Sequence, residues 1–283
     1  IAKPQQFEEM VKARAAELAH LSDRPGGQGI ALTPLKRDAD EAGYRYTHVE
    51  VALDRAARTA TLTVTAPMGR QPDELEEILT QGARWWPLAM ARELDDAILM
   101  LRTNDLDVGL WQIRTRGDLA AVLEADATMA KFKDNWFVRE TIGMLRRCLR
   151  RLDVSSRSMF AVLDEGSCFG GLFFELALAA DRSFMLKIED DFARAPKAAL
   201  SEANFGLYPM NNGLSRLATR FAGEAAPVEA ARATLGKTLE ADQVAELGLV
   251  TFTPDELDWD EELRIAIEER TALSPDALTG MEA

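Results

Sequence analysis

The chain has 283 residues, of which 47% are hydrophobic and 28% are charged; this is ordinary for a soluble globular protein with a sizeable core. Its formal net charge of −14 argues against a nucleic-acid-binding surface, because phosphate backbones are bound by basic patches. The two cysteines suggest no disulfide framework, and the two histidines lie too far from them for metal-ligand spacing. No apolar run has the length of a membrane span and no signal peptide is evident, so we expect a reduced, cytoplasmic protein.

The first predicted elements are a helix and a β-hairpin. Residues 7–21 place several apolar side chains on one helical face. Proline and glycine cluster at residues 23–29 and predict a break in the chain there. Residues 44–53 and 58–65 alternate apolar and polar side chains as half-buried strands do, and residues 54–57 would form the turn between them.

The rest of the chain alternates predicted helices with short apolar strands. The strands are expected at residues 108–113, 159–163, 183–188 and 248–251. The helices are expected at residues 72–80, 85–102, 134–152, 172–180, 212–221, 227–235, 241–247 and 259–273. This alternation predicts crossover units around a largely parallel sheet.

Residues 158–221 contain the candidate chemistry. A buried strand turns through Gly170-Gly171 into an apolar helix that carries Glu175. Because the first amides of a helix have no partner within it, such a turn can bind an anion or a developing oxyanion. Glu202, in Leu-Ser-Glu-x-x-Phe-Gly-Leu-x-Pro, is a second carboxylate. In an apolar pocket its pKa would rise, which suits a group that moves protons near neutral pH.

These motifs resemble those of the crotonase (enoyl-CoA hydratase/isomerase) superfamily. The resemblance rests on the Gly-Gly turn followed by Glu-Leu-Ala, on the Ser-Glu segment and on Ser-Arg-Leu. A more specific resemblance runs over nearly the whole chain. In this respect the chain resembles the later half of the benzoyl-CoA-dihydrodiol lyase (epoxybenzoyl-CoA dihydrolase) family. Three stretches carry this resemblance: Trp85-Trp86-Pro87-Leu88, Asn135-Trp136-Phe137-Val138-Arg139-Glu140-Thr141 and Phe205-Gly206-Leu207-Tyr208-Pro209-Met210. The resemblance implies an α/β fold of the crotonase-like (ClpP/crotonase) type, a spiral of ββα units with a helical C-terminal segment.

The resemblance also implies a division of the chain, because that family looks like two crotonase-like halves fused together. Residues 1–25 would be the closing helix of a preceding half, and residues 26–283 a crotonase-like domain with a helical C-terminal region. Phe-Glu-Glu-Met at residues 7–10 and Asp-Glu-Glu-Leu at residues 260–263 each lead into a helix, which fits a repeat. Two unrelated surface helices are the alternative.

By the same resemblance, Gly117 would supply one oxyanion-hole amide and Gly171, or alternatively Gly170, the other. Glu202 and Glu175 would be the catalytic carboxylates. The sequence departs from the superfamily around these residues. The loop at Gly117-Asp118 is short, and Asp118 is alternatively the N-cap of a following helix. One extra residue separates the glycines from Glu175, which turns this side chain by roughly 100° around the helix.

Each candidate residue also has a purely structural interpretation. Glu202 is alternatively a turn-capping carboxylate, Glu175 a carboxylate held by a local partner, and Cys168 a small buried hydrophobe rather than a nucleophile. The arginine-rich helix at residues 134–152 either is solvated or contacts coenzyme A phosphates, a neighbouring half or another subunit.

Three hypotheses follow. The intact protein resembles a lyase of aerobic benzoate degradation that opens the ring of epoxybenzoyl-CoA with water and loses formate. It would need no cofactor beyond the coenzyme A of its thioester substrate and would form a homo-oligomer, such as a dimer. Alternatively, this half is catalytically silent and supports the fold or dimerisation, which the departures at Gly117, Glu175 and Asn211-Asn212 favour. The third hypothesis is a free-standing enoyl-CoA hydratase or isomerase relative.

Overall fold

The computed structural model describes residues 3–22, 27 and 29–282, and the chain divides into two units, Ile1–Leu32 and Thr33–Ala283. In the first unit, α1 (Pro4–Ala19) is the helix expected from the apolar spacing. Its proline stands in the first turn, where the missing N–H has no intrahelical partner to lose. Phe7, Val11 and Leu18 are 50–61% exposed. The predicted break at residues 23–29, and with it the boundary at residue 25, falls mostly outside the described residues.

A single sheet forms the centre of the second unit. Its seven strands follow chain order: β1 (Asp38–Asp40), β2 (Gly43–Arg45), β3 (Val49–Asp54), β4 (Thr59–Thr65), β5 (Leu110–Arg116), β6 (Ser158–Leu163) and β7 (Arg182–Met185). Strands β1 to β4 pair antiparallel, and β4 to β7 pair parallel. The sheet is therefore mixed, with the predicted parallel part confined to its second half.

The first predicted strand was wrong in one respect. Residues 44–53 are not one strand, because the chain turns back at Tyr46, whose N–H donates to the Val49 carbonyl at 2.9 Å. Strands β2 and β3 on either side of that turn pair with each other. The apolar alternation changes phase at this turn: Tyr44 precedes it at an even position, and Val49 and Val51 follow it at odd positions. The β3–β4 hairpin was predicted correctly.

Helices follow the strands as the crossover pattern predicts. They are α2 (Leu75–Gln81), α3 (Trp86–Asn104), α4 (Leu119–Lys131), α5 (Trp136–Asp153), α6 (Leu172–Leu178), α7 (Arg216–Arg220), α8 (Ala225–Arg232), α9 (Ala241–Glu246), α10 (Trp259–Thr271) and α11 (Pro275–Glu282), with short 3₁₀ turns η1 (Gly82–Arg84) and η2 (Glu202–Phe205). Each connection between parallel strands thus contains at least one helix, as parallel pairing requires.

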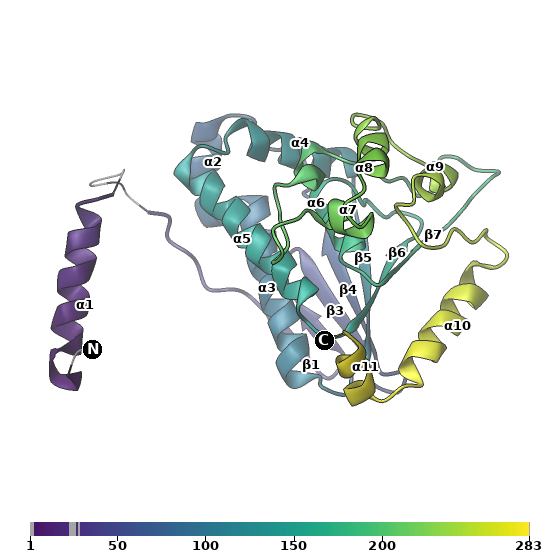
Figure 1. The fold of residues 1–283 in the computed structure, drawn as a ribbon, viewed down its shortest axis with the longest axis horizontal. Coiled ribbons are helices and arrows are strands. Elements are labelled where there is room, and N and C mark those ends of the chain that lie inside the picture. Colours follow the sequence, from purple (N-terminus) through teal and green to yellow (C-terminus); the bar gives the residue numbers. More distant parts are fainter. Residues whose placement is uncertain (1–2, 23–26, 28, 283) are drawn as a thin grey trace. The chain divides into compact units, whose positions relative to one another are not determined.

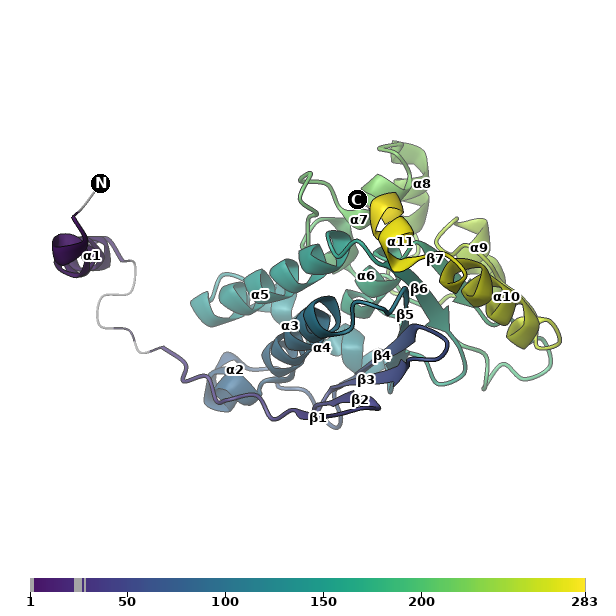
Figure 2. The same cartoon turned by 90° about the horizontal axis from the view of Figure 1, so that it is seen from below.

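The helices lie on both faces of the parallel strands. Helices α3 and α5 pack side by side on one face, and α10 lies on the other (Figures 1 and 2). Helix α10 contributes Leu263 and Ala266 to a core with apolar residues of three strands, Leu110, Phe160, Val162 and Phe184. Every residue of β6 is buried, which explains why its sequence is a continuous apolar run rather than an alternating one.

Two differences lie near the C-terminus. The strand predicted at residues 248–251 does not form; the chain just beyond it makes only isolated parallel bridges, from Phe252 to Phe184 and from Asp255 to Lys187. Helix α11, which the sequence analysis did not predict, buries Leu278 completely. Within the described residues, the helices are all too short or too polar to cross a bilayer.

Candidate active site at the β6–α6 turn

The turn between β6 and α6 has the backbone path that the two glycines predict. Gly171 is the N-cap of α6 and adopts φ +45°, a left-handed conformation that favours glycine. A Cβ atom at this position would lie 1.8 Å from Oδ2 of Asp126 and 2.8 Å from Oγ of Ser201. Glycine is therefore required here by the close approach of two polar side chains as well as by the backbone.

The amides of this turn are already paired within the fold. The Gly170 N–H donates to the Cys168 carbonyl at 2.9 Å, and the Gly171 N–H donates to the Ala199 carbonyl at 3.0 Å. The Leu172 N–H donates to Asp126 Oδ2 at 2.9 Å. The expectation that free amides of this turn face a cleft is therefore wrong. An oxyanion could use them only after displacing these internal acceptors.

Asp126 occupies the position that an anion would take at the start of α6. It comes from α4, and its Oδ2 atom accepts both the Leu172 N–H and the Ser201 hydroxyl, the latter at 2.7 Å. Its Oδ1 atom is buried and has no hydrogen-bond partner. Burial raises the pKa of Asp126 to about 7, because the charged carboxylate is desolvated there.

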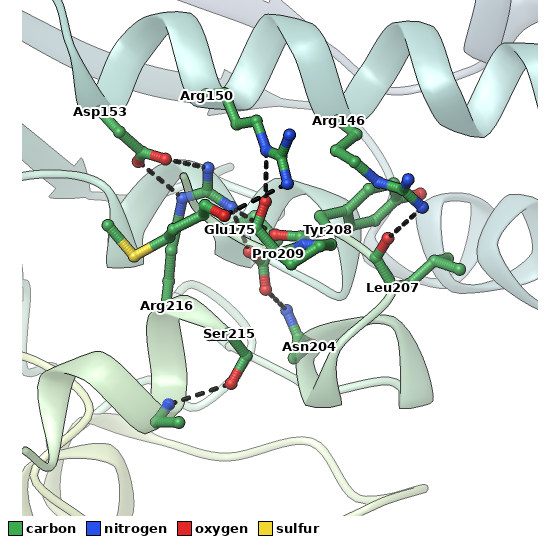
Figure 3. Close-up of polar contacts among 12 residues, drawn as sticks. Arg146, Arg150, Asp153, Glu175, Asn204, Leu207, Tyr208, Pro209, Ser215 and Arg216 are labelled. Carbon is green, nitrogen blue, oxygen red and sulfur yellow. Dashed lines mark hydrogen bonds and ion pairs between the residues drawn. The ribbon is translucent and has the colours of Figure 1, made fainter. Parts of the chain in front are cut away.

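Glu175 is buried and held by one ion pair and one side-chain hydrogen bond. Its side chain is 1% exposed. Its Oε1 atom accepts from Asn204 Nδ2 at 2.8 Å, and its Oε2 atom lies 2.8 Å from Arg216 Nη1 (Figure 3). Burial raises the pKa of Glu175, while the charge of Arg216 acts in the opposite direction. This geometry matches the structural interpretation of Glu175, a carboxylate held by neighbouring side chains, although Asn204 and Arg216 are distant in sequence.

Arg216 is the hub of this buried network. It is 1% exposed, and it makes a two-pronged contact with Asp153, through Nη2 at 2.7 Å and Nε at 2.9 Å. Its Nη1 atom also donates to the Tyr208 carbonyl at 3.0 Å. One guanidinium thus holds together α5, α6 and α7 (Figure 3). A planar fork with five donors suits such a role, which lysine cannot reproduce.

Glu202 lies outside this network. Its side chain is 71% exposed and pairs with Arg232 Nη1 at 3.1 Å, and the same guanidinium lies 4.0 Å from the centre of the Phe205 ring. The prediction of an apolar pocket around Glu202 is therefore wrong. The motif forms the 3₁₀ turn η2, which directs Asn204 inward and leaves Glu202 at the surface.

Gly117 also has a local structural role. It adopts φ +122°, and a Cβ atom there would lie 2.7 Å from Ala66 Cβ. Asp118 is the N-cap of α4 and accepts the Ala120 N–H at 2.9 Å, which is the alternative considered for this loop. Gly117 lines a hollow of about 420 Å³ together with residues 165–167 and 193–197. Gly171, Glu175 and Glu202 are absent from that lining.

Cys168 lies just before the turn and has the features of a structural residue. Cys168 is buried, its N–H donates to Thr115 Oγ1 at 2.9 Å, and burial raises the pKa of its thiol to about 11. Such a thiol carries little thiolate, the nucleophilic form, at neutral pH. Both cysteines are free.

Sequence reasoning missed Asp126, Asn204 and Arg216 as members of this site. Asp126 had a detectable signal, because it lies on the same helical face as the buried Val122 and Met129. An acidic side chain on an apolar helical face is expected to have a buried hydrogen-bond or ion-pair partner, because an unpaired buried carboxylate is unfavourable. Arg216 lies in the Ser-Arg-Leu motif, whose sequence gives no sign that the arginine is buried. No local pattern identified its partners, which are 63 and 41 residues away.

Comparisons with known proteins agree with this fold. The chain is 59% identical over 285 aligned residues to the benzoyl-CoA-dihydrodiol lyase of Aromatoleum evansii; the alignment covers 100% of this chain and 51% of that protein. The chain thus spans about half the length of the curated relative it matches. No family model matches the chain.

Solved structures of enoyl-CoA hydratases share the fold. The enzyme of Bacillus anthracis matches with a TM-score of 0.55 at 16% identity over 83% of this chain and 81% of that one. The enzyme of Bacillus halodurans matches with a TM-score of 0.54 at 15% identity over 83% and 85%. The described domain therefore has the α/β crotonase-like fold that the sequence predicts.

Proposed function

We propose that this chain is part of a larger enzyme of the benzoyl-CoA-dihydrodiol lyase type, a carbon–carbon lyase that acts on an aromatic acyl-CoA. The intact enzyme would open the ring of epoxybenzoyl-CoA with water and release formate, using no cofactor beyond the coenzyme A of its substrate. The similarity along the whole chain to half of such a lyase supports this assignment. We also infer that the intact protein is a homo-oligomer.

Within that enzyme, we infer that this part is a catalytically silent scaffold. The observation that carries this inference is the occupied turn before α6, where Asp126 and the Ala199 carbonyl accept the amides that an oxyanion would need. Stabilisation of an oxyanion depends on donors that are free to point at the developing charge. The two candidate carboxylates do not compensate, since Glu175 is ion-paired inside the core and Glu202 is at the surface.

The test is substitution of Glu202 in the full-length enzyme. Removing a general acid or base typically lowers the rate by about 10²- to 10⁴-fold. For Glu202→Gln we expect the turnover of epoxybenzoyl-CoA to stay within about twofold of wild type, since in a silent half this residue would contribute nothing to the rate. Steady-state kinetics with matched protein concentrations would measure this.

Glu229→Gln is the matched control, because Glu229 is also an exposed partner of Arg232. A rate loss of 100-fold or more for Glu202→Gln, with the Glu229→Gln protein unaffected and both folded, would place the chemistry in this half and overturn the scaffold proposal. Equal rates for wild type and both variants would support it.

A further inference from the structure

A pocket rich in arginine lies along α5. It has a volume of about 310 Å³ and is lined by Arg102, Gly143, Arg146, Arg147, Arg150, Arg151, Val154 and Asn211. We call these residues the arginine pocket. Four of its arginines come from consecutive turns of α5, and the fifth comes from α3. Its volume is within the usual range for small-molecule sites, about 300–1,000 Å³.

The positive charge of the arginine pocket is largely uncompensated. Arg151 pairs with Asp95 at 2.8 Å. Among the described residues, the other four arginines have no carboxylate within ion-pair distance. Asp153 lies close enough to Arg150 to be influenced by it, but both carboxylate oxygens of Asp153 are bound by Arg216. Like charges that lie close together repel one another, and a bound anion would offset this repulsion.

Two of these guanidiniums are held in place by the backbone of a neighbouring loop. Arg146 Nη2 donates to the Leu207 carbonyl at 3.3 Å, and Arg150 donates to the Pro209 and Met210 carbonyls at 2.7 and 3.2 Å (Figure 3). These bonds use only some of the five donors of each guanidinium. The buried Nε atom of Arg146 has no hydrogen-bond partner. The pocket is thus preorganised and retains unused donors.

We propose that the arginine pocket binds a polyphosphate anion. Guanidinium forks match the oxygens of phosphate groups in pairs, and several fixed forks favour a ligand with two or more phosphates. Two sources supply this chemistry: the phosphorylated nucleotide part of coenzyme A, or a free diphosphate. An acidic protein segment is the competing occupant, but a concave pocket of this volume fits a small molecule better than an extended chain. This site does not depend on any reaction in this half.

The experiment is isothermal titration of the full-length protein with pyrophosphate, adenosine 3′,5′-bisphosphate and coenzyme A, for wild type and the double variant Arg102→Gln/Arg147→Gln. Neither of these arginines anchors the 207–210 loop, so we expect the variant to fold. Each charged hydrogen bond lost weakens binding by about tenfold or more. We therefore expect pyrophosphate to bind wild type, and its Kd to rise at least tenfold in the double variant.

Arg139→Gln is the matched control, because Arg139 lies exposed on the same helix and does not line the pocket. We expect it to leave every Kd within about twofold, since loss of one distant surface charge is largely screened by salt. Tighter binding of coenzyme A and the bisphosphate than of pyrophosphate, lost in the double variant, would identify the nucleotide as the source. Pyrophosphate that binds as tightly as coenzyme A, and more tightly than the bisphosphate, whose two phosphates are not joined, would identify a free diphosphate.

Three results would overturn the proposal. One is that wild type binds none of the three probes. Another is that the double variant and Arg139→Gln weaken binding equally, which would indicate a general charge effect. The third is unchanged anion binding in the double variant; a change in its sedimentation coefficient as well would make this surface a contact for an acidic protein segment.

Discussion

The carboxylate of Asp126 lies where a strand-to-helix turn of this type would otherwise present an amide to a ligand. Its pKa is raised to about 7 by burial, with a smaller contribution from the charge of Glu175. The folded protein therefore holds a proton on Asp126 at pH values where the unfolded chain, with a pKa near 3.8, has released it. Since the unfolded state binds fewer protons in this interval, stability falls as the pH rises from about 4 to about 7.

Asp126→Asn removes this titration while keeping an oxygen that accepts the Leu172 N–H. We expect wild type to lose stability relative to Asp126→Asn between pH 5 and pH 8, by an amount on the order of a few kcal/mol. Urea unfolding at several pH values measures the difference. Asp118→Asn is the control, because Asp118 is the exposed N-cap of the same helix and asparagine caps as well as aspartate does. Parallel pH profiles for wild type and Asp126→Asn would contradict the prediction.

Some features of this site are predictable from local sequence, and others depend on contacts between distant residues. The strand, the glycine turn and the helix were predictable, because apolar runs and Gly171 are local signals. The surface position of Glu202 was not, because the partner that holds it, Arg232, is 30 residues away. Nor was the contact between Asp126 and Leu172, which are 46 residues apart. Helix periodicity predicts that Asp126 is buried, but the atoms it meets are determined only by tertiary packing.

At the scale of elements, three helices meet at one buried guanidinium. Arg216 of α7 contacts Asp153 at the end of α5 and Glu175 in the middle of α6. Burial raises the pKa of both carboxylates, and Arg216 lowers it. Burial destabilises the charged carboxylates and the charge of Arg216 stabilises them. The network is therefore stable only while the arginine and both carboxylates are present.

Arg216→Met leaves two buried carboxylates without their partner. We expect this change to lower the free energy of unfolding by about 3–5 kcal/mol, the usual cost of breaking a buried ion pair. Chemical denaturation at neutral pH provides the measurement. Arg232→Met is the matched comparison, because Arg232 pairs with the exposed Glu202; we expect it to cost about 1 kcal/mol or less. Similar losses for the two variants would show that the buried network contributes no special stability.

At the scale of the whole molecule, the chain consists of a compact domain and a separate helical segment, each a unit by itself. Helix α1 exposes Phe7, Met10, Val11 and Leu18, and no residue of α1 is buried. These positions share one helical face. We propose, from the resemblance to a two-part lyase, that this face packs on the preceding half of the intact protein.

In the full-length enzyme, Phe7→Ser/Val11→Ser tests this proposal. Burial of an apolar side chain of this size contributes about 1.5–3 kcal/mol, so we expect the double variant to lower the thermal midpoint by several degrees. Differential scanning calorimetry measures the midpoint. Leu257→Ser serves as the control, because Leu257 is 92% exposed in the domain. An unchanged midpoint in the double variant would mean that the face stays in water.

The contact between Gly171 and Asp126 limits how this domain can change. Mutating Asp126 to a small residue would free the Leu172 amide, but Gly171 would still donate to Ala199, and Glu175 would still be held by Arg216 and Asn204. Freeing the amides at the start of α6 and releasing Glu175 would therefore require changes at several contacting side chains together. Because these residues contact one another, we expect substitutions among them to be non-additive in their effect on the free energy of unfolding.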